Sequence, residues 1–230
     1  MEDLNIFGNL EVKAMSEVWH LETPISEKQI RKLKLLDTVF ISGKLWGIRD
    51  RNLGREIDDG VPLPDGVNYE GYPVLHEASG YKKVGNEWFF TSGMGTTTST
   101  RMERWMPTLI ERHRCRAVIG KGGLLEGTTE ACKKFGCVYL DVVGGAASYY
   151  DSRAKIINVY WPDLDSQAIL ECEIKDYGPM FVGIDANGNN QYLNLREKAI
   201  QKRQEIYDML HIKPLPWAPQ WIERPREKNY

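Results

Sequence analysis

The sequence has few cysteines and histidines, and neither residue type is spaced as a metal or disulfide motif. Four cysteines occur among 230 residues, none forms a CxxC pair, and the four histidines lie far apart. This pattern argues against a disulfide framework and against an iron–sulfur cluster or another metal held by this chain. We expect a reduced, cytoplasmic protein whose cysteines are small core residues, namely Cys115, Cys132, Cys137 and Cys172.

The sequence also lacks an excess of charge of either sign and a long apolar run. The 30 Lys and Arg residues are nearly balanced by 32 Asp and Glu, so no strong basic field indicates a nucleic-acid partner. No apolar run approaches the ~20 residues that span a bilayer, and the acidic start Met1-Glu2-Asp3-Leu4 does not resemble a signal peptide. We therefore expect neither nucleic acid nor a membrane as a partner.

Strand-like and helix-like runs alternate through the middle of the chain, which predicts an α/β fold with a partly parallel sheet. We expect a sheet-rich, three-layer domain over residues 26–212, preceded by an irregular N-terminal arm (1–25) and followed by a tail with four prolines (213–230). The expected strands are 39–42, 45–48, 72–77, 81–84, 87–91, 117–119, 138–143, 169–174 and 180–184, with a turn at 176–179. The expected helices are 26–36, 49–60, 101–113, 128–136 and 195–210, the third strained by Pro107 unless it begins late.

Two glycine-bracketed segments each hold one cation where a strand-like run gives way to a turn or helix. The first segment is Gly95–Met102, which contains Arg101, and the second is Ile119–Leu124, which contains Lys121. At such places free backbone N–H groups and the positive end of a helix favour an anion. Two such cradles in one small domain predict a substrate with more than one negative group, for which a small di-acid is the natural candidate.

The cations have competing interpretations when they are judged by position alone. Arg101 stands at a predicted helix start, where a cation is unfavourable unless an anion is bound. Lys121 lies between glycines and could equally be an exposed loop lysine. Arg49 lies among other charged residues, so a solvated charged surface explains it as well.

Four segments occur in a characteristic order along the chain: VFISGKLWGIRD (39–50), GTTTSTRM (95–102), IGKGGL (119–124) and IKDYGPMFVGIDANGN (174–189). Together they resemble the β-type subunit of class I, iron–sulfur-dependent hydro-lyases, which are the tartrate dehydratases and class I fumarases. The resemblance runs from about residue 25 to about residue 210. Any one of these strings alone would be weak, whereas their combination and order are specific.

The resemblance implies a swivelling β/β/α domain that pairs with an alpha subunit in an α2β2 heterotetramer. It further implies that three cysteines of the alpha subunit, and not of this chain, hold a [4Fe–4S] cluster whose open iron site binds the substrate. The implied reaction is the reversible addition or removal of water in a small hydroxy-dicarboxylic acid, at a site shared by the two subunits.

Five residues are the site candidates. By resemblance Arg49, Arg101 and Lys121 hold substrate carboxylates, and Thr97 takes part in proton transfer at the reacting carbon. We place Thr97 and Lys121 as catalytic residues, and Arg49, Thr98, Arg101 and Lys121 as substrate-binding residues. A threonine hydroxyl is a poor base unless its surroundings are unusual, so Thr97 is expected to act with a carboxylate of the partner subunit.

The chain departs from the family pattern near these residues. Thr96 replaces a proline, Leu53 stands where a histidine is common, and HEASG (76–80) stands where a Gly-Pro pair is common. These differences put the identity of the acid in doubt more than the reaction class. Two alternatives are a phosphate- or nucleotide-binding α/β enzyme, although neither cradle fits a P-loop or a dinucleotide fingerprint, and a non-catalytic partner subunit that retains the fold.

Overall fold

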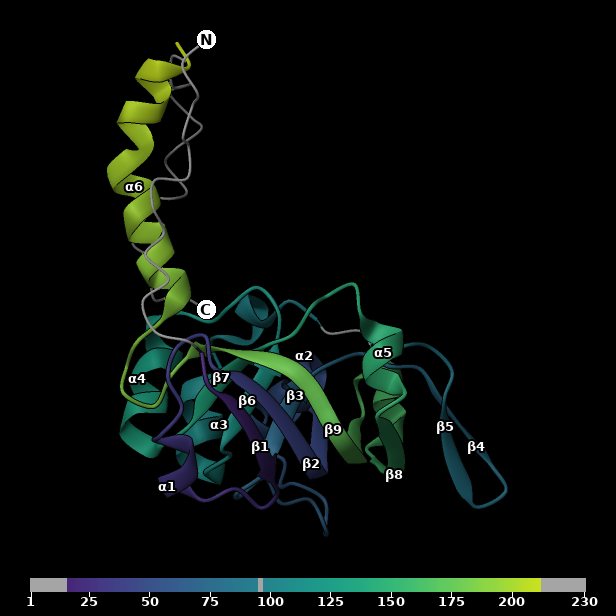
Figure 1. The fold of residues 1–230 in the computed structure, drawn as a ribbon. Coiled ribbons are helices and arrows are strands. Elements are labelled where there is room, and N and C mark those ends of the chain that lie inside the picture. Colours follow the sequence, from purple (N-terminus) through teal and green to yellow (C-terminus); the bar gives the residue numbers. More distant parts are fainter. Residues whose placement is uncertain (1–15, 95–96, 212–230) are drawn as a thin grey trace.

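The computed structural model describes residues 16–94 and 97–211, which form a mixed α/β domain, as the sequence predicted (Figure 1). The strands are β1 (Val18–Glu22), β2 (Thr38–Ile48), β3 (Pro73–His76), β4 (Tyr81–Val84), β5 (Glu87–Phe90), β6 (Ala117–Gly120), β7 (Val138–Asp141), β8 (Ala154–Tyr160) and β9 (Ile169–Ile184). The α-helices are α1 (Glu27–Ile30), α2 (Asp50–Leu53), α3 (Met106–His113), α4 (Glu126–Phe135), α5 (Ala147–Asp151) and α6 (Gln191–Met209). Short π- and 3₁₀-helices are η1 (Gly54–Asp58), η2 (Ser99–Met102) and η3 (Pro162–Gln167).

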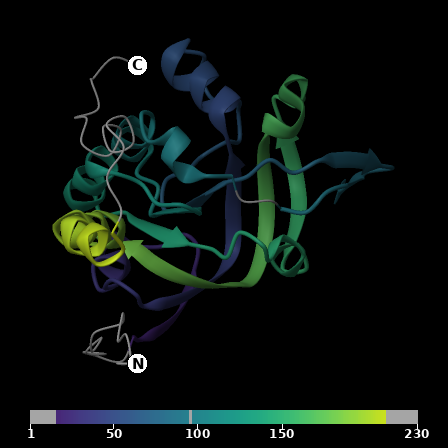
Figure 2. The ribbon, with the colours of Figure 1, turned by 90° about the horizontal axis from the view of Figure 1, so that it is seen from above.

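Seven of the described strands form one sheet in the order β1-β2-β3-β6-β7-β9-β8, and β4 and β5 form a separate hairpin. The strands from β1 to β7 in this order are parallel, whereas β9 is antiparallel to β7, β8 and β2. Because β2 pairs with β9 as well as with β3, the sheet closes on itself, with the long β9 curving around one side (Figure 2).

Alternate residues of the central strands point into two different apolar clusters, as the period of two requires. In β6, Ala117 and Ile119 belong to one cluster with residues of β2, β8 and β9, and Val118 belongs to the other. The second cluster includes Leu109 of α3 and Cys132 of α4, so these helices cover that face of the sheet. Both faces of the parallel strands are therefore buried, as is usual for parallel sheets.

In two places the sequence predicted two short strands where the structure has one long strand. The predicted strands 39–42 and 45–48 are both part of β2, and 169–174 and 180–184 are both part of β9, which contains the expected turn at 176–179. Asp176 and Gly178 do have positive φ angles, of 45° and 157°, and the β2–β9 ladder changes register opposite them. The turn residues therefore produce an irregularity in the ladder rather than a chain reversal.

The prediction of an irregular chain before residue 26 was wrong for residues 18–22, which form the edge strand β1. Asp37 holds this strand in place, since its carboxylate accepts hydrogen bonds from Glu17 N and from Trp19 Nε1, both at 3.0 Å. Strand β8 was not predicted either. Strands β1 and β8 are the first and last in the order of the sheet, so each pairs with one neighbouring strand.

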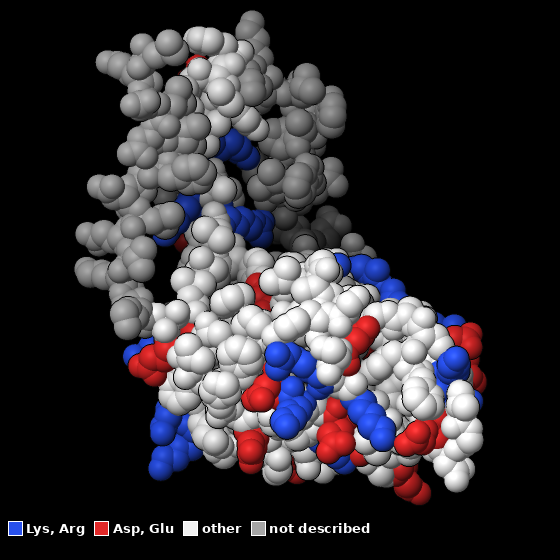
Figure 3. Space-filling model, turned by 45° about the vertical axis from the view of Figure 1, so that its right-hand side comes forward, with Lys and Arg blue, Asp and Glu red and all other residues white. Residues whose placement is uncertain are grey.

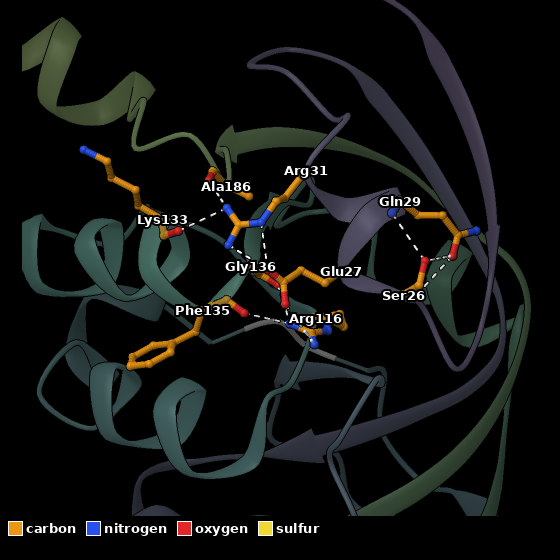
Figure 4. Close-up of polar contacts among 9 residues, drawn as sticks. All are labelled: Ser26, Glu27, Gln29, Arg31, Arg116, Lys133, Phe135, Gly136 and Ala186. Atoms are coloured by element: carbon orange, nitrogen blue, oxygen red, sulfur yellow. Dashed lines mark hydrogen bonds and ion pairs between the residues drawn. The ribbon is translucent and has the colours of Figure 1, made fainter.

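Helix boundaries follow local signals where those signals exist. The α1 helix has the expected Ser26 cap, closed into a capping box with Gln29, but it ends at Ile30 (Figure 4). The third predicted helix does begin late, with Pro107 in the first turn of α3. The α4 helix begins at Glu126 rather than at residue 128, because the distant Glu103 carboxylate accepts from Leu125 N at 2.7 Å and from Thr128 N at 3.0 Å.

Helix α6 and the β4–β5 hairpin extend from the rest of the domain. Figure 1 shows α6 standing away from the sheet and the β4–β5 hairpin projecting on the other side. Basic and acidic side chains are interspersed over the face drawn in Figure 3. Within the described residues, no helix combines the length and the apolar character that a bilayer crossing requires.

An arginine cluster secures the carboxyl end of α4 (Figure 4). Arg116 donates to the carbonyl oxygens of Phe135 and Gly136 at 2.7 and 2.9 Å. Arg31 donates to Lys133 O at 3.2 Å and to Ala186 O at 3.1 Å. These guanidinium groups satisfy carbonyls that a helix end otherwise leaves without partners.

We expect Arg116→Ala to lower the free energy of unfolding by ~2 kcal/mol, because it removes two charge-assisted hydrogen bonds from a largely buried side chain. Chemical denaturation measures this change. Lys134→Ala is the matched control in the same helix, since the Lys134 side chain is exposed and its ion pair to Glu111 spans 3.9 Å. The control is expected to stay within ~0.5 kcal/mol of the parent protein. Equal effects of both substitutions would contradict this role of Arg116.

Candidate active site

Three parallel strands end side by side, and the candidate residues follow those ends. Strands β2, β3 and β6 are neighbours in the sheet, with parallel register. Arg49 follows β2, Glu77 follows β3 and Lys121 follows β6. Ligands of α/β sheets bind at the carboxyl ends of the strands. This edge of the sheet is therefore the candidate active site.

The two predicted cradles lie against each other and form one site. Thr98 pairs with Lys121 in a parallel β-bridge, and Ser99 N donates to Lys121 O at 2.8 Å. The Thr100 hydroxyl donates to the carbonyls of Gly122 and Gly123 at 3.0 and 3.1 Å. Gly95 and Thr96, which open the first cradle, lie outside the described residues.

The contact between the cradles requires glycine at Gly120. A Cβ atom built on Gly120 would lie 2.0 Å from Ser99 Oγ, which is buried and cannot move away without losing its hydrogen bonds. Gly122 and Gly123 have φ angles of 80° and 76°, a region that side chains disfavour. The glycines of the second cradle therefore serve close packing and backbone conformation.

The prediction that Arg101 stands at the start of an α-helix was wrong. Arg101 lies in the last turn of the 3₁₀-helix η2, and α3 begins only at Met106. Its guanidinium group forms an ion pair with the carboxylate of Asp50, the residue after Arg49. Arg101 is half exposed, so it remains open to a ligand on its other side. A helix dipole therefore does not favour an anion at Arg101, which lies instead beside Asp50, the residue after Arg49.

Arg49 and Lys121 are less neutralised than Arg101. Arg49 Nε lies 3.9 Å from Asp50 Oδ1, beyond hydrogen-bond reach, and it is buried with no hydrogen-bond partner among the residues that the structure describes. Lys121 has no ion pair within residues 16–94 and 97–211, and its stem packs where a Cβ of Gly144 would lie, 2.8 Å from Lys121 Cδ. Cations held this way are available for a bound anion.

Backbone contacts place both candidate threonines, Thr97 beside the end of β3 and Thr98 beside Lys121. Thr97 N donates to His76 O at 2.9 Å, which fixes the Thr97 backbone at the end of β3. Thr98 is exposed and is held by its bridge to Lys121. The five predicted site residues thus meet at one edge of the sheet, although their individual roles stay predictions.

Two carboxylic acids near this edge were missed by the sequence interpretation. Glu77 is fully buried at the end of β3, and burial raises its pKa to about 7, with the Arg49 charge opposing the rise. Its Oε2 accepts from Ser79 N at 2.5 Å. Asp141, at the end of β7, has a pKa raised to about 6 by burial. The only sequence signal for Glu77 was the unusual HEASG segment that contains it. The burial that raises both pKa values is a tertiary property, which a local sequence pattern does not show.

Two further polar residues make hydrogen bonds within this chain that serve its structure. His76 is buried, and its Nδ1 is 2.9 Å from Ser99 Oγ, so it is a hydrogen-bonded structural histidine at that nitrogen. Burial lowers the pKa of His76 to about 3, which keeps the ring neutral. Asp185 accepts from Asn187 N and Asn189 N at 2.9 and 3.0 Å, which is a local turn arrangement.

The side chains of this chain do not fit an iron–sulfur cluster. All four cysteines are free and buried in the apolar core, as the sequence predicted. Burial contributes to raising the pKa of the Cys115, Cys137 and Cys172 thiols, which disfavours the thiolate that a cluster requires. Within the described part of the chain, no group of three or more His, Cys, Asp or Glu side chains could hold a metal ion.

We expect Gly120→Ala to destabilise the protein by ~1–3 kcal/mol, because the added methyl group displaces Ser99 from its buried hydrogen bonds. Gly145→Ala is the matched control, since a Cβ at Gly145 meets nothing within 4 Å. Urea denaturation of both variants compares them, with the control expected within ~0.5 kcal/mol of the parent. A neutral Gly120→Ala variant would show that the two cradles do not pack as described.

Glu77 makes stability depend on pH in a defined direction. Between its ordinary pKa of 4.5 and its folded pKa of about 7, the unfolded chain loses the Glu77 proton whereas the folded protein keeps it. Rising pH therefore favours the unfolded state, and the stability lost by pH 7.5 is ~3 kcal/mol. Glu77→Gln should remove this loss. The difference in unfolding free energy between the two proteins, measured at pH 4.5 and 7.5, checks the prediction, and a constant difference would refute it.

Comparison with known protein families shows a match to the family described as "Fumarase C-terminus" over residues 5–195. The L(+)-tartrate dehydratase subunit beta of Escherichia coli K12 is 30% identical over 190 residues, which cover 82% of this chain and 93% of that protein. A Methanocaldococcus jannaschii protein, provisionally named as an L(+)-tartrate dehydratase subunit beta, is 30% identical over 192 residues, covering 79% of this chain and 95% of its own length.

A longer protein also matches. A Geobacillus stearothermophilus protein, provisionally named as a class I fumarate hydratase, is 32% identical over 188 residues. The match covers 81% of this chain but 36% of that protein. This chain therefore corresponds to one part of a larger polypeptide in one relative, and to nearly the whole of a beta subunit in others.

Proposed function

The chain belongs to the fumarase C-terminus family, and from this membership we propose that it is the beta subunit of a hydro-lyase that reversibly dehydrates a small hydroxy-dicarboxylic acid. The observation that carries the proposal is the convergence of Arg49, Arg101 and Lys121 at the ends of parallel strands. Three fixed cations suit a molecule with two carboxylates. Fumarate, tartrate and related acids all meet this description.

These cations would act on the charge that develops during dehydration. The hydrogen lost lies on the carbon beside a carboxylate, and its removal places negative charge on that carboxylate. An arginine grips a carboxylate through two parallel hydrogen bonds, and a lysine adds a compact positive charge. Positive groups fixed at this place stabilise the transition state without having to reorganise.

We propose that Thr97, whose neighbour Thr98 pairs with Lys121, relays the proton together with a carboxylate of the partner subunit. Its backbone is anchored to His76 O, which fixes the direction of the segment. Glu77 and Asp141 are the carboxyl groups of this chain whose pKa values are raised to about 7 and about 6 near this edge. In this proposal Thr97 passes the proton on, and the carboxylate of the partner subunit accepts it.

The proposal includes a partner and a cofactor. A relative named as a beta subunit implies an alpha subunit, and we propose an α2β2 assembly in the cytoplasm. A [4Fe–4S] cluster, typical of the class I enzymes, would be held by the alpha subunit, in keeping with the buried cysteines of this chain. We further propose that the mixed α/β domain is the three-layer, swivelling β/β/α type that the resemblance implies.

The decisive experiment co-expresses this chain with its alpha subunit under anaerobic conditions and measures hydration and dehydration of di-acids. We expect turnover by the complex and none by this chain alone. Stabilisation of the complex by nucleotides and not by di-acids, without di-acid turnover, would refute the proposal and favour a nucleotide-binding enzyme.

Within that complex, Lys121→Met should lower kcat/KM by ~10²–10³, because it removes a cation that acts in the transition state. Lys82→Met is the matched control, since Lys82 is an exposed lysine of the β4–β5 hairpin. Steady-state kinetics on both variants measures the difference. An unchanged kcat/KM for Lys121→Met would remove Lys121 from the site.

A further inference from the structure

A chain of buried polar groups runs beneath the candidate active site. The Tyr139 hydroxyl donates to Ser99 Oγ at 3.1 Å, and Ser99 Oγ lies 2.9 Å from His76 Nδ1. All three residues are fully buried. They come from β7, from η2 and from the end of β3, so the chain connects three separate elements at the site.

The hydrogen-bond chain is compatible with one tautomer of His76 that leaves a donor on its far nitrogen. When Tyr139 donates to Ser99, the single hydroxyl hydrogen of Ser99 is available for His76 Nδ1 as the acceptor. In that arrangement the neutral ring carries its hydrogen on Nε2. His76 then presents an N–H donor on the side away from Ser99.

That donor has no partner within the described residues, and two neighbouring polar atoms share this condition. They are Arg49 Nε and Asp50 Oδ1, which are buried, lack a hydrogen bond and lie 3.9 Å apart. His76 is the register partner of Ile48, so Arg49 and Asp50 follow directly beside it. The Asp50 charge acts on the His76 ring, raising its pKa against the effect of burial.

The three atoms are chemically complementary. In this arrangement His76 Nε2 and Arg49 Nε are donors, and Asp50 Oδ1 is an acceptor. Buried polar atoms without partners are rare in folded proteins, so their grouping at one place calls for an explanation. The other oxygen of Asp50 already holds Arg101 in an ion pair.

We propose that His76 is a positioning residue that acts through Asp50 to fix the guanidinium groups of Arg49 and Arg101 for binding a substrate carboxylate. The inference rests on the proposed function, because it names the residues that orient the di-acid site. His76 does not touch the substrate, since its side chain is fully buried. Its contribution is a donor of fixed direction.

The first test reads the tautomer and needs no catalytic activity. Nitrogen-15 NMR of the histidine rings in the full-length chain, assigned by comparison with His76→Gln, should show a neutral His76 with its hydrogen on Nε2 from pH 5 to pH 8. A hydrogen on Nδ1, or a charged ring in this range, would overturn the inference.

The second test measures the binding of succinate, an unreactive di-acid, to the complex with the alpha subunit by calorimetry. His76→Phe, which fills the volume without a donor, should raise the Kd at least tenfold. His76→Gln, which keeps an N–H donor near the position of Nε2, should stay within threefold of the parent. In the Asp50→Asn background, His76→Phe should change the Kd by less than twofold, because the two residues act in series.

Equal and additive losses in both backgrounds would assign His76 a merely structural role and overturn the inference, as would an unchanged Kd for His76→Phe. If His76→Phe does not fold, Ser99→Ala takes its place: it frees Nδ1 and should raise the Kd threefold or more, and no change would overturn the inference. Neither test uses turnover. A parent complex that binds succinate but dehydrates no di-acid therefore refutes the proposed function alone, and one that binds no succinate overturns both.

Discussion

The parallel pairing of β2, β3 and β6 is the constraint on which the site depends. Because these strands run in one direction, their carboxyl ends meet, and the residues that follow them become neighbours despite large separations in sequence. This register places Arg49 and Lys121 at the same edge of the sheet. The closure of the sheet by the β2–β9 pairing then holds β2 on both sides, so the position of Arg49 does not depend on a flexible edge.

Close packing, as well as charge, arranges the residues of the site. Gly120 allows Ser99 to lie directly against β6, and Ser99 in turn connects Tyr139 with His76. A side chain at Gly120 would separate the first cradle from the second. The glycines near a lysine therefore matter less as a phosphate-binding signal than as the place where two backbone segments touch.

Cations and buried carboxyl groups gathered at one edge of the sheet lower the stability of the folded chain. Arg49 has an unpartnered buried nitrogen, and Glu77 is a buried carboxyl group that is stable mainly when protonated. Such costs are common where a fold serves binding or catalysis rather than its own stability. They are also expected in a chain that supplies part of a site, because ligand and partner satisfy the groups that the chain alone leaves incomplete.

The sequence by itself determined the features that depend on nearby residues and on residue type. These include the mixed α/β class, the late start of α3 at Pro107 and the family. The motif order also located the cations, since these residue types occur in the sequence itself.

Only the tertiary structure decided the features that join distant residues. The start of α4 depends on a hydrogen bond from Leu125 N to Glu103, which is 22 residues away in sequence. Pairing with β2 keeps the chain extended, though irregular, at Gly178, where the sequence predicted a turn. The ion pair of Arg101 with Asp50 spans 51 residues, and the raised pKa of Glu77 comes from burial. Local patterns act over a few residues of chain, whereas ladders, ion pairs and desolvation depend on which segments the fold brings together.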